Sequence, residues 1–176
     1  MALRFDRPLR TAPLRFVDLE TTGLRPDRGA RIAEMAIVDE SGVQFKWTSP
    51  HDPPRDAAVA TQLPRLIAHL EDGIVVGHNL SFDFRFVTYE AERLGCSGLD
   101  VRFVDTLRLA RTTLETAPSH RLGALLDAVG ATPETELHTA VGDAVAARTL
   151  FWQLVERGGL TTLADAGLKR LRWYGR

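Results

Sequence analysis

Two acidic side chains in an apolar segment near the N-terminus are the first residues in this sequence that could do chemistry. Asp18 and Glu20 are surrounded by leucine, phenylalanine and valine, which favours an extended and largely buried strand. Residues two apart on a strand point to the same face, so both carboxylates would project together. Like charges held there repel each other and lose hydration, a combination that normally raises their pKa values or recruits a cation. A solvated strand end with two surface acids is the alternative that these residues leave open.

The residues after this strand could bring the backbone close to a ligand. Thr21-Thr22-Gly23 follows Glu20 directly. Small polar residues and a glycine let the chain turn sharply and leave room for another molecule. We therefore expect a turn at the end of the acidic strand.

Two further acids stand in similar positions. Asp83 follows the short apolar run Ile74–Gly77 and would lie in the first turn of a helix beside a strand end. Asp143 lies in a predicted helix whose neighbouring positions are small or apolar, and His138 precedes it by five residues. An aspartate in such a helix needs a functional reason.

Taken together, three segments resemble the exonuclease motifs of the DnaQ-like 3′–5′ exonuclease family. They are Val17–Gly23, Gly77–Asp83 and His138–Ala144, in the family's order, and His138 matches the branch with a histidine in the third motif, known as DEDDh. Asp-x-Glu alone is common by chance, whereas the three motifs in order are specific. The resemblance spans about residues 14 to 156, and Asp105–Arg111 and Leu122–Leu126 also resemble family segments.

The resemblance implies a metal site. In the family, residues matching Asp18, Glu20, Asp83 and Asp143 hold two divalent ions, whose charge would balance the four carboxylates. Ligand sets made of oxygen favour Mg²⁺ or Mn²⁺ over softer metals. Two such ions beside a phosphate activate the attacking water and stabilise the leaving 3′ oxygen. We expect a metal-free site to be partly protonated or hydrated.

The resemblance also implies a general base. His138 would take the proton of the attacking water, because histidine is the side chain suited to proton transfer near neutral pH. Its place before the helix suggests a loop that closes over the substrate. An ordinary capping or surface histidine is the alternative.

By the same resemblance, residues of the first two motifs would bind the 3′-terminal nucleotide. They are Thr21, Thr22, Gly23, Leu24, His78, Asn79 and Phe82. Leu24 would pack on the base. Phe82 equally fits the apolar stripe of its helix, and His78 equally fits a buried histidine bonded to the backbone.

The expected substrate is the 3′ end of single-stranded nucleic acid, with nucleoside 5′-monophosphates as products. DNA is favoured over RNA because the motifs resemble those of bacterial proofreading subunits, which also makes a polymerase a candidate partner. An RNA-trimming exonuclease, and a polymerase-associated or nucleic-acid-binding module with little turnover, are the alternatives. Nothing in these motifs supplies a base-specific code.

The elements that must position these residues read as an α/β protein. Three strands, to about Thr48, form an antiparallel meander, with a turn at Glu40–Gly42. The later order is helix, strand, helix, strand, two helices and a long helix to about Glu156, with Pro64 expected to break the first helix. The series predicts a mixed sheet, antiparallel then parallel, with helices on both faces. This matches the ribonuclease H-like fold that the resemblance implies.

Bulk composition fits one exonuclease domain over residues 1–176, with a C-terminal extension at 157–176. The net charge is −1, with 26% charged residues, so any polyanion-binding site must be local or metal-assisted. Cys96 is the only cysteine, which excludes an internal disulfide and a cysteine-cluster metal site. No run approaches about 18 apolar residues, so we expect a cytoplasmic protein that does not enter membranes. The tail Leu168–Arg176 mixes cationic and aromatic residues, a composition that suits nucleic acid, although a docked or frayed terminus is the commoner outcome.

Overall fold

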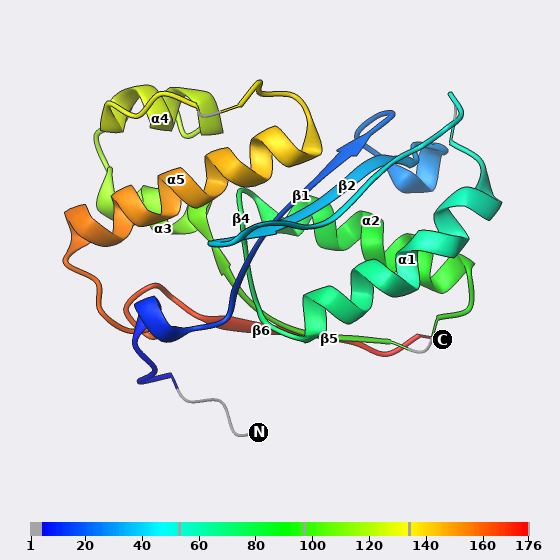
Figure 1. The fold of residues 1–176 in the computed structure, drawn as a ribbon, viewed down its shortest axis with the longest axis horizontal. Coiled ribbons are helices and arrows are strands. Elements are labelled where there is room, and N and C mark those ends of the chain that lie inside the picture. The colour runs from blue at the N-terminus through cyan, green and yellow to red at the C-terminus, as the bar shows by residue number, and fades with distance from the viewer. Residues whose placement is uncertain (1–4, 53, 97, 134, 176) are drawn as a thin grey trace.

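The computed structural model describes residues 5–52, 54–96, 98–133 and 135–175, which form one six-stranded mixed sheet with helices on both faces (Figure 1). The sheet order is β3-β2-β1-β4-β5-β6. The strands are β1 (Leu14–Thr21), β2 (Ile32–Asp39), β3 (Gly42–Thr48), β4 (Ile74–Gly77), β5 (Leu99–Asp105) and β6 (Lys169–Trp173). The helices are α1 (Asp56–Glu71), α2 (Leu80–Arg93), α3 (Thr106–Thr113), α4 (Leu122–Val129) and α5 (Ala140–Gly158), with short 3-10 turns at Leu9–Thr11 and Pro26–Arg28.

The acidic strand β1 lies at the centre of the sheet. It pairs antiparallel with β2 and parallel with β4, and β2 continues antiparallel into β3. Because β1, β4 and β5 run parallel to one another, the loops that follow them lie at the same end of the sheet. The predicted meander and the parallel crossovers are confirmed, and the α/β fold class with them.

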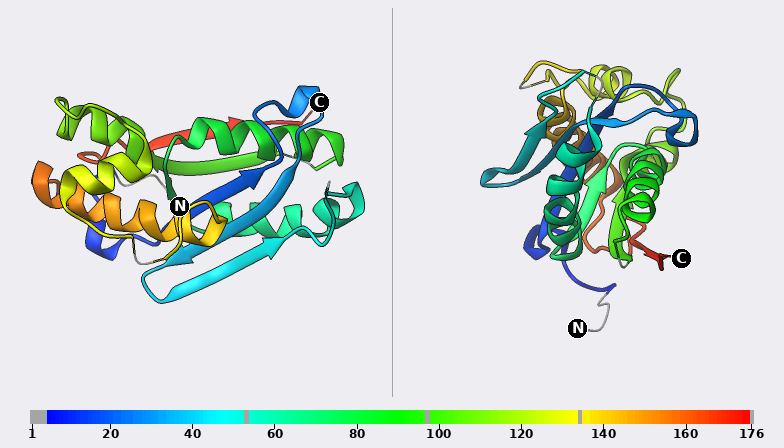
Figure 2. Two further views of the ribbon diagram at one scale, coloured as in Figure 1. Left: turned by 90° about the horizontal axis from the view of Figure 1, so that it is seen from above. Right: turned by 90° about the vertical axis from the view of Figure 1, so that its right-hand side faces the viewer.

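Each face of the sheet is covered by its own set of helices. Buried side chains of α3, α4 and α5 pack with Phe16 and Val76 on one face. Those of α1 and α2 pack with Val17 and Val75 on the other. Figure 2 shows this three-layer arrangement from two further sides. Alternate residues of β1 therefore enter different cores, and Asp18 shares the face of Phe16, under α5.

Polar side chains and a glycine define several of the helix ends. Asp105 caps α3 by accepting a hydrogen bond from the amide of Leu107, and Thr139 caps α5 by accepting one from Gly142. Gly130, with φ of 72°, ends α4 in the left-handed conformation that glycine favours. Asn79 occupies the cap position of α2, but its side chain makes no capping bond.

The expected break at Pro64 is wrong. Helix α1 runs without interruption from Asp56 to Glu71 with Pro64 inside it. Proline removes one helical hydrogen bond. The residues of the predicted apolar stripe, including Val59, Leu63 and Leu66, are buried. Burial of about five such side chains outweighs the roughly 3 kcal/mol that an internal proline costs.

The C-terminal tail was not expected to extend the sheet, and this is a second difference. Lys169–Trp173 forms β6, which pairs antiparallel with β5, so the sheet is antiparallel at both edges. In the described part of the chain, no helix is long and apolar enough to cross a membrane.

Candidate active site

Strand β1 and the start of α5 bring three of the predicted carboxylates together. Asp18, Glu20 and Asp143 are each half-buried, and each has a carboxylate oxygen within 4.8 Å of an oxygen of the other two. Asp18 and Glu20 share a face of β1 because they are two residues apart. Asp143 lies in the first turn of α5, the helix that covers this face. The same-face prediction is therefore confirmed.

Asp83 enters the site from α2 and lies deeper than the others. Its side chain is 5% exposed, and one carboxylate oxygen accepts a hydrogen bond of 3.1 Å from the amide of Leu19. The amide lies between Asp18 and Glu20 in the chain, so this bond ties α2 to the acidic strand. Asp83 stands next to Asp18 rather than within the cluster of three.

Within the part of the chain that the structure describes, no cationic side chain pairs with the four carboxylates. Burial raises the pKa of Asp18 well above its usual value, and the charges of Asp83, Asp143 and Glu20 raise it further. Burial and then Asp143 also raise the pKa of Glu20, while His138 opposes this shift. Among the described residues, no lysine or arginine forms an ion pair with any of the four. An all-oxygen cluster of this kind suits hard divalent cations such as Mg²⁺ or Mn²⁺.

The burial of Asp83 predicts that the stability of the metal-free protein depends on pH. Burial raises its pKa to about 7. The folded metal-free protein therefore holds a proton that the unfolded chain loses near pH 4, and this stabilising contribution disappears as pH rises towards 7. We expect the free energy of unfolding in chelator to fall over this window. Asp83→Asn should flatten that dependence while keeping the oxygen that accepts from Leu19.

Thermal melts in chelator between pH 4 and 8 measure this effect. Addition of Mn²⁺ at pH 8 should restore stability to the wild-type protein and not to Asp83→Asn. Identical pH profiles for the two proteins would contradict the assignment of a raised pKa to Asp83.

His138 lies on the exposed loop that leads into α5. Its backbone has φ of 68°, an uncommon conformation for a residue other than glycine. Its amide donates a hydrogen bond of 3.2 Å to the carboxylate of Asp143. The imidazole stays exposed to solvent next to the carboxylate cluster. This is an accessible position from which a side chain could exchange protons with a bound molecule.

The loop after β1 forms the turn that was predicted at the end of the acidic strand. The hydroxyl of Thr21 donates to the carbonyl of Gly23, which closes the turn. Leu24 is 76% exposed although it is apolar. Such a side chain is available to pack against a flat ligand surface.

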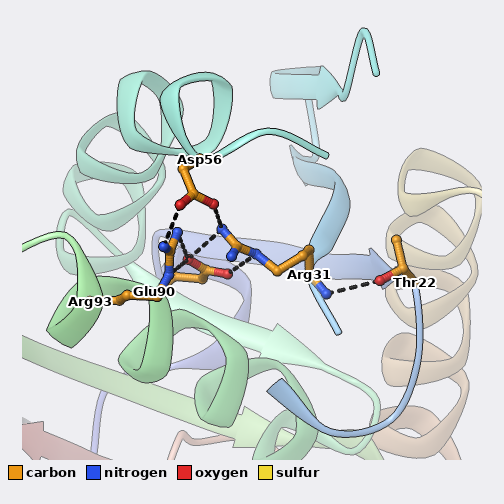
Figure 3. A network of polar contacts seen from close by, with 5 residues as sticks. All are labelled: Thr22, Arg31, Asp56, Glu90 and Arg93. Carbon is orange, nitrogen blue, oxygen red and sulfur yellow. Dashed lines mark hydrogen bonds and ion pairs between the residues drawn. The ribbon is translucent and has the colours of Figure 1, made fainter. Parts of the chain in front are cut away.

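An ion-pair network around the buried Glu90 connects this loop to α1 and α2 (Figure 3). The hydroxyl of Thr22 accepts a hydrogen bond from the amide of Arg31. The guanidinium of Arg31 pairs with Glu90, which is fully buried in α2, and with Asp56 of α1. Arg93 contacts the same two carboxylates. The sequence motifs gave no sign of this network, because its members are spread over three elements.

The remaining predicted nucleotide contacts have different surroundings. Asn79 is exposed at the start of α2, with φ of 64°. Phe82 is half-buried against the ring of Phe86, at a centroid distance of 5.0 Å. His78 has both ring nitrogens engaged, Nδ1 with the hydroxyl of Thr106 and Nε2 with the carbonyl of His120, each at 2.9 Å. A carbonyl only accepts, so Nε2 carries a proton, and this geometry favours a structural role for His78.

Comparison with known protein families identifies the family of this chain. A family model described as an exonuclease matches residues 43–151, more than half of the chain, and the match includes Asp83, His138 and Asp143. The chain belongs to the DnaQ-like 3′–5′ exonuclease family. The strand that carries Asp18 and Glu20 lies before the matched range, and β2 lies between the two.

Sequence alignments with relatives of this exonuclease domain extend beyond the range that the family model matches. A DNA polymerase III PolC-type protein of Thermotoga petrophila is 30% identical over 93% of the chain. A DNA polymerase III subunit epsilon-like protein of Rhodobacter capsulatus is 30% identical over 97% of it. The chain spans only 14% and 28% of the lengths of these two proteins.

Solved nuclease structures share the fold of this exonuclease domain. Exonuclease X in complex with 5′ overhanging duplex DNA superposes with a TM-score of 0.57 and 21% identity, covering 88% of this chain and 99% of that one. Brucella melitensis NrnC bound to pGG gives 0.61 and 19%, covering 89% and 79%. These likenesses support the ribonuclease H-like architecture.

A fifth acid beside the carboxylate cluster, Glu34, was not predicted. It lies on β2 directly opposite Glu20 and raises the pKa of both Asp18 and Glu20. Its carboxylate accepts a hydrogen bond of 3.1 Å from the amide of Ala140, the first residue of α5. Glu34 thus joins the sheet to the helix that follows the His138 loop.

We expect Glu34→Ala to lower turnover about ten- to a hundredfold, because a displacement of about 1 Å at the start of α5 is enough to cost that much. Glu34→Gln keeps an oxygen that can accept from Ala140 and should retain most of the activity. Steady-state rates on one labelled oligonucleotide measure both variants. Equal losses would show that the charge of Glu34, and not its hydrogen bond, matters.

Gly142 lets the His138 loop lie against α5. A methyl group at this position would come within 1.9 Å of the carbonyl oxygen of Glu136 and 2.7 Å of the hydroxyl of Thr139. We expect Gly142→Ala to reduce stability by about 1–3 kcal/mol, as overpacking does, and to lower turnover because the loop must shift. Gly123→Ala in α4 is the matched control. Its methyl would meet Leu137 at an ordinary 3.6 Å, so unfolding curves should show little change or a gain.

Proposed function

We propose that this chain hydrolyses the phosphodiester bond at the 3′ end of single-stranded nucleic acid and releases nucleoside 5′-monophosphates. One observation carries the proposal. Asp18, Glu20 and Asp143 converge within 4.8 Å with no balancing cation from the described chain, beside an exposed histidine. The family membership supports the same reaction.

The carboxylates would hold two divalent ions, Mg²⁺ or Mn²⁺. Asp18, Glu20 and Asp143 form the cluster in which one cation fits, and Asp83 adds a buried carboxylate beside Asp18. Bound ions would supply Lewis acidity and lower the pKa of water near the phosphate. The raised pKa values of Asp18 and Asp83 support this role, because groups that repel each other without metal gain most from a cation.

His138 would act as the general base. Its exposed imidazole can take a proton from the water that attacks the terminal phosphorus. The new P–O bond forms as the bond to the 3′ oxygen of the preceding nucleotide breaks, and that oxygen then takes up a proton. The hydrogen bond from the amide of His138 to Asp143 would keep the base beside the carboxylates.

The turn after β1 would receive the terminal nucleotide. Backbone and hydroxyl groups of Thr21, Thr22 and Gly23 would contact it, and the exposed Leu24 would pack on its base. Asn79 would line the other side of the pocket, with Phe82 behind it. Such contacts do not distinguish bases, so we propose degradation without sequence preference. DNA is the proposed preferred substrate because the motifs resemble those of proofreading subunits.

Chromatography of the products tests this proposal. The protein would be incubated with Mg²⁺ and single-stranded DNA or RNA oligomers of one sequence, with chelator and Asp18→Asn as controls. The expected products are 5′-mononucleotides, formed faster from DNA. Faster release from RNA would reassign the substrate sugar. Release of 3′-mononucleotides would overturn the reaction itself.

A further inference from the structure

A second groove lies across α2 from the carboxylates and gathers arginine side chains. Its volume is about 650 Å³, and it is lined by residues of α2, α3, β5 and the edge strand β6. Four arginines contribute, Arg85, Arg108, Arg111 and Arg172. They come from three separate elements, so the fold and not a single charged run brings them together.

Most of this positive charge has no acidic partner among the described residues. Arg85, Arg108 and Arg111 are exposed, and none forms an ion pair with a residue that the structure describes. Only Arg172 contacts a carboxylate, that of Asp100, at 3.5 Å. The protein as a whole carries a net charge of −1. The groove is therefore a local positive region suited to a polyanion.

The acid in the groove wall is already engaged. One oxygen of Asp105 accepts hydrogen bonds of 3.0 Å from the amides of both Asn79 and Leu107. Asp105 is 8% exposed. Its oxygen is held by these two amides, and its single negative charge is outnumbered by the four arginines of the groove.

Aromatic rings line the same groove as the arginines. Phe84 and Phe103 meet edge to face with their centroids 5.1 Å apart, and the half-buried Trp173 completes the wall. The guanidinium of Arg85 lies 5.4 Å from the centre of the Phe82 ring. Cationic side chains interleaved with aromatic rings are the composition that binds single strands, by phosphate contacts and base stacking.

The groove is close enough to the carboxylates for one strand to reach both. Asp83 points from α2 towards β1, and Arg85 lies two residues further, about 200° around the helix. A helix with its side chains is about 10–12 Å across. The width of the helix therefore corresponds to about three nucleotides of a stacked strand, which are about 3.4 Å apart.

We propose that this arginine groove binds the substrate strand a few nucleotides upstream of its 3′ end. The proposal rests on the proposed function, because it takes the 3′ end to lie at the carboxylates. The groove would hold long substrates without contacting the reacting phosphate. Affinity for long strands should depend on it, whereas cleavage of a dinucleotide should not.

Fluorescence anisotropy with chelator present tests the groove without any cleavage. The probe is a 5′-labelled single-stranded DNA of about 12 nucleotides, measured at several salt concentrations against wild-type protein, Arg108→Ala/Arg111→Ala and Arg108→Gln/Arg111→Gln. The control Arg10→Ala/Arg65→Ala removes the same charge from two exposed arginines outside the groove. Circular dichroism would confirm that each variant is folded.

Both groove variants should bind about tenfold more weakly, and the slope of log affinity against log salt should fall by about 1.4, for two phosphate contacts. The control should bind like the wild type, and dinucleotide hydrolysis with Mg²⁺ should be unchanged in all variants. Equal losses in groove and control variants would overturn the proposal. So would displacement of the DNA by polyglutamate of the same charge, which would indicate an acidic protein partner.

The two proposals can fail separately. Absence of hydrolysis by the wild-type protein would reject the catalytic function and leave the binding comparison intact. Dinucleotide cleavage that falls as much as long-strand binding would place Arg108 and Arg111 in the catalytic site and overturn the groove proposal.

Discussion

Asp18→Asn should abolish turnover, with a loss of at least about a thousandfold, or about 4 kcal/mol of transition-state stabilisation. Asp18 is the carboxylate that interacts with all the others, since Asp83, Asp143 and Glu20 each raise its pKa. Asparagine keeps the volume and removes the charge that a cation needs. Calorimetric titration with Mn²⁺ should show the loss of metal binding directly.

The same variant should not be less stable than the wild type in chelator. Removal of one of several like charges from a buried cluster relieves repulsion, so the melting temperature should stay equal or rise. Asp72→Asn is a suitable control, because Asp72 is 76% exposed and only weakly paired with Arg15 at 3.8 Å. Full Mn²⁺ affinity in Asp18→Asn would contradict the role of Asp18 as a ligand.

His138→Asn should reduce turnover by about a hundred- to ten-thousandfold, the usual contribution of a general base. Asparagine tolerates the positive φ of 68° and keeps the amide that donates to Asp143, so the loop should hold its shape. Mn²⁺ affinity should remain close to that of the wild type, because the imidazole is not among the proposed ligands.

The comparison of the two variants separates binding from catalysis. His51→Ala, a change at an exposed histidine in the loop after β3, should leave both quantities unchanged. Equal loss of Mn²⁺ affinity in His138→Asn and Asp18→Asn would contradict the separate roles of Asp18 in metal binding and His138 in proton transfer. His138 would then be a ligand or a structural residue.

The sequence predicted the parts of the site that depend on spacing along the chain. Asp18 and Glu20 share a face because a strand repeats every two residues. The apolar run Ile74–Gly77 becomes the strand β4 that leads to Asp83. The small residues around Asp143 allow the close contact that Gly142 makes with the preceding loop.

The parts that depend on contacts across the fold could not be predicted in the same way. Glu34 looks like an ordinary polar residue of β2 until the register places it opposite Glu20 and below Ala140. The pairing of Arg31 with Glu90 joins residues 59 apart in sequence. Strand β6 forms because the backbone of β5 would otherwise lie at the edge of the sheet without a partner strand, and no local pattern in Lys169–Trp173 reveals this pairing. Pro64 stays helical because tertiary burial outweighs local propensity.

The most direct test of the central claim is a time course on a single-stranded DNA oligomer labelled at its 5′ end, with Mg²⁺ or with chelator. The carboxylate cluster and the exposed His138 predict a ladder of labelled products that shorten one nucleotide at a time from the 3′ end, only with Mg²⁺. An intact oligomer with Mg²⁺, early release of the labelled 5′ nucleotide, or an equal ladder in chelator would contradict the account.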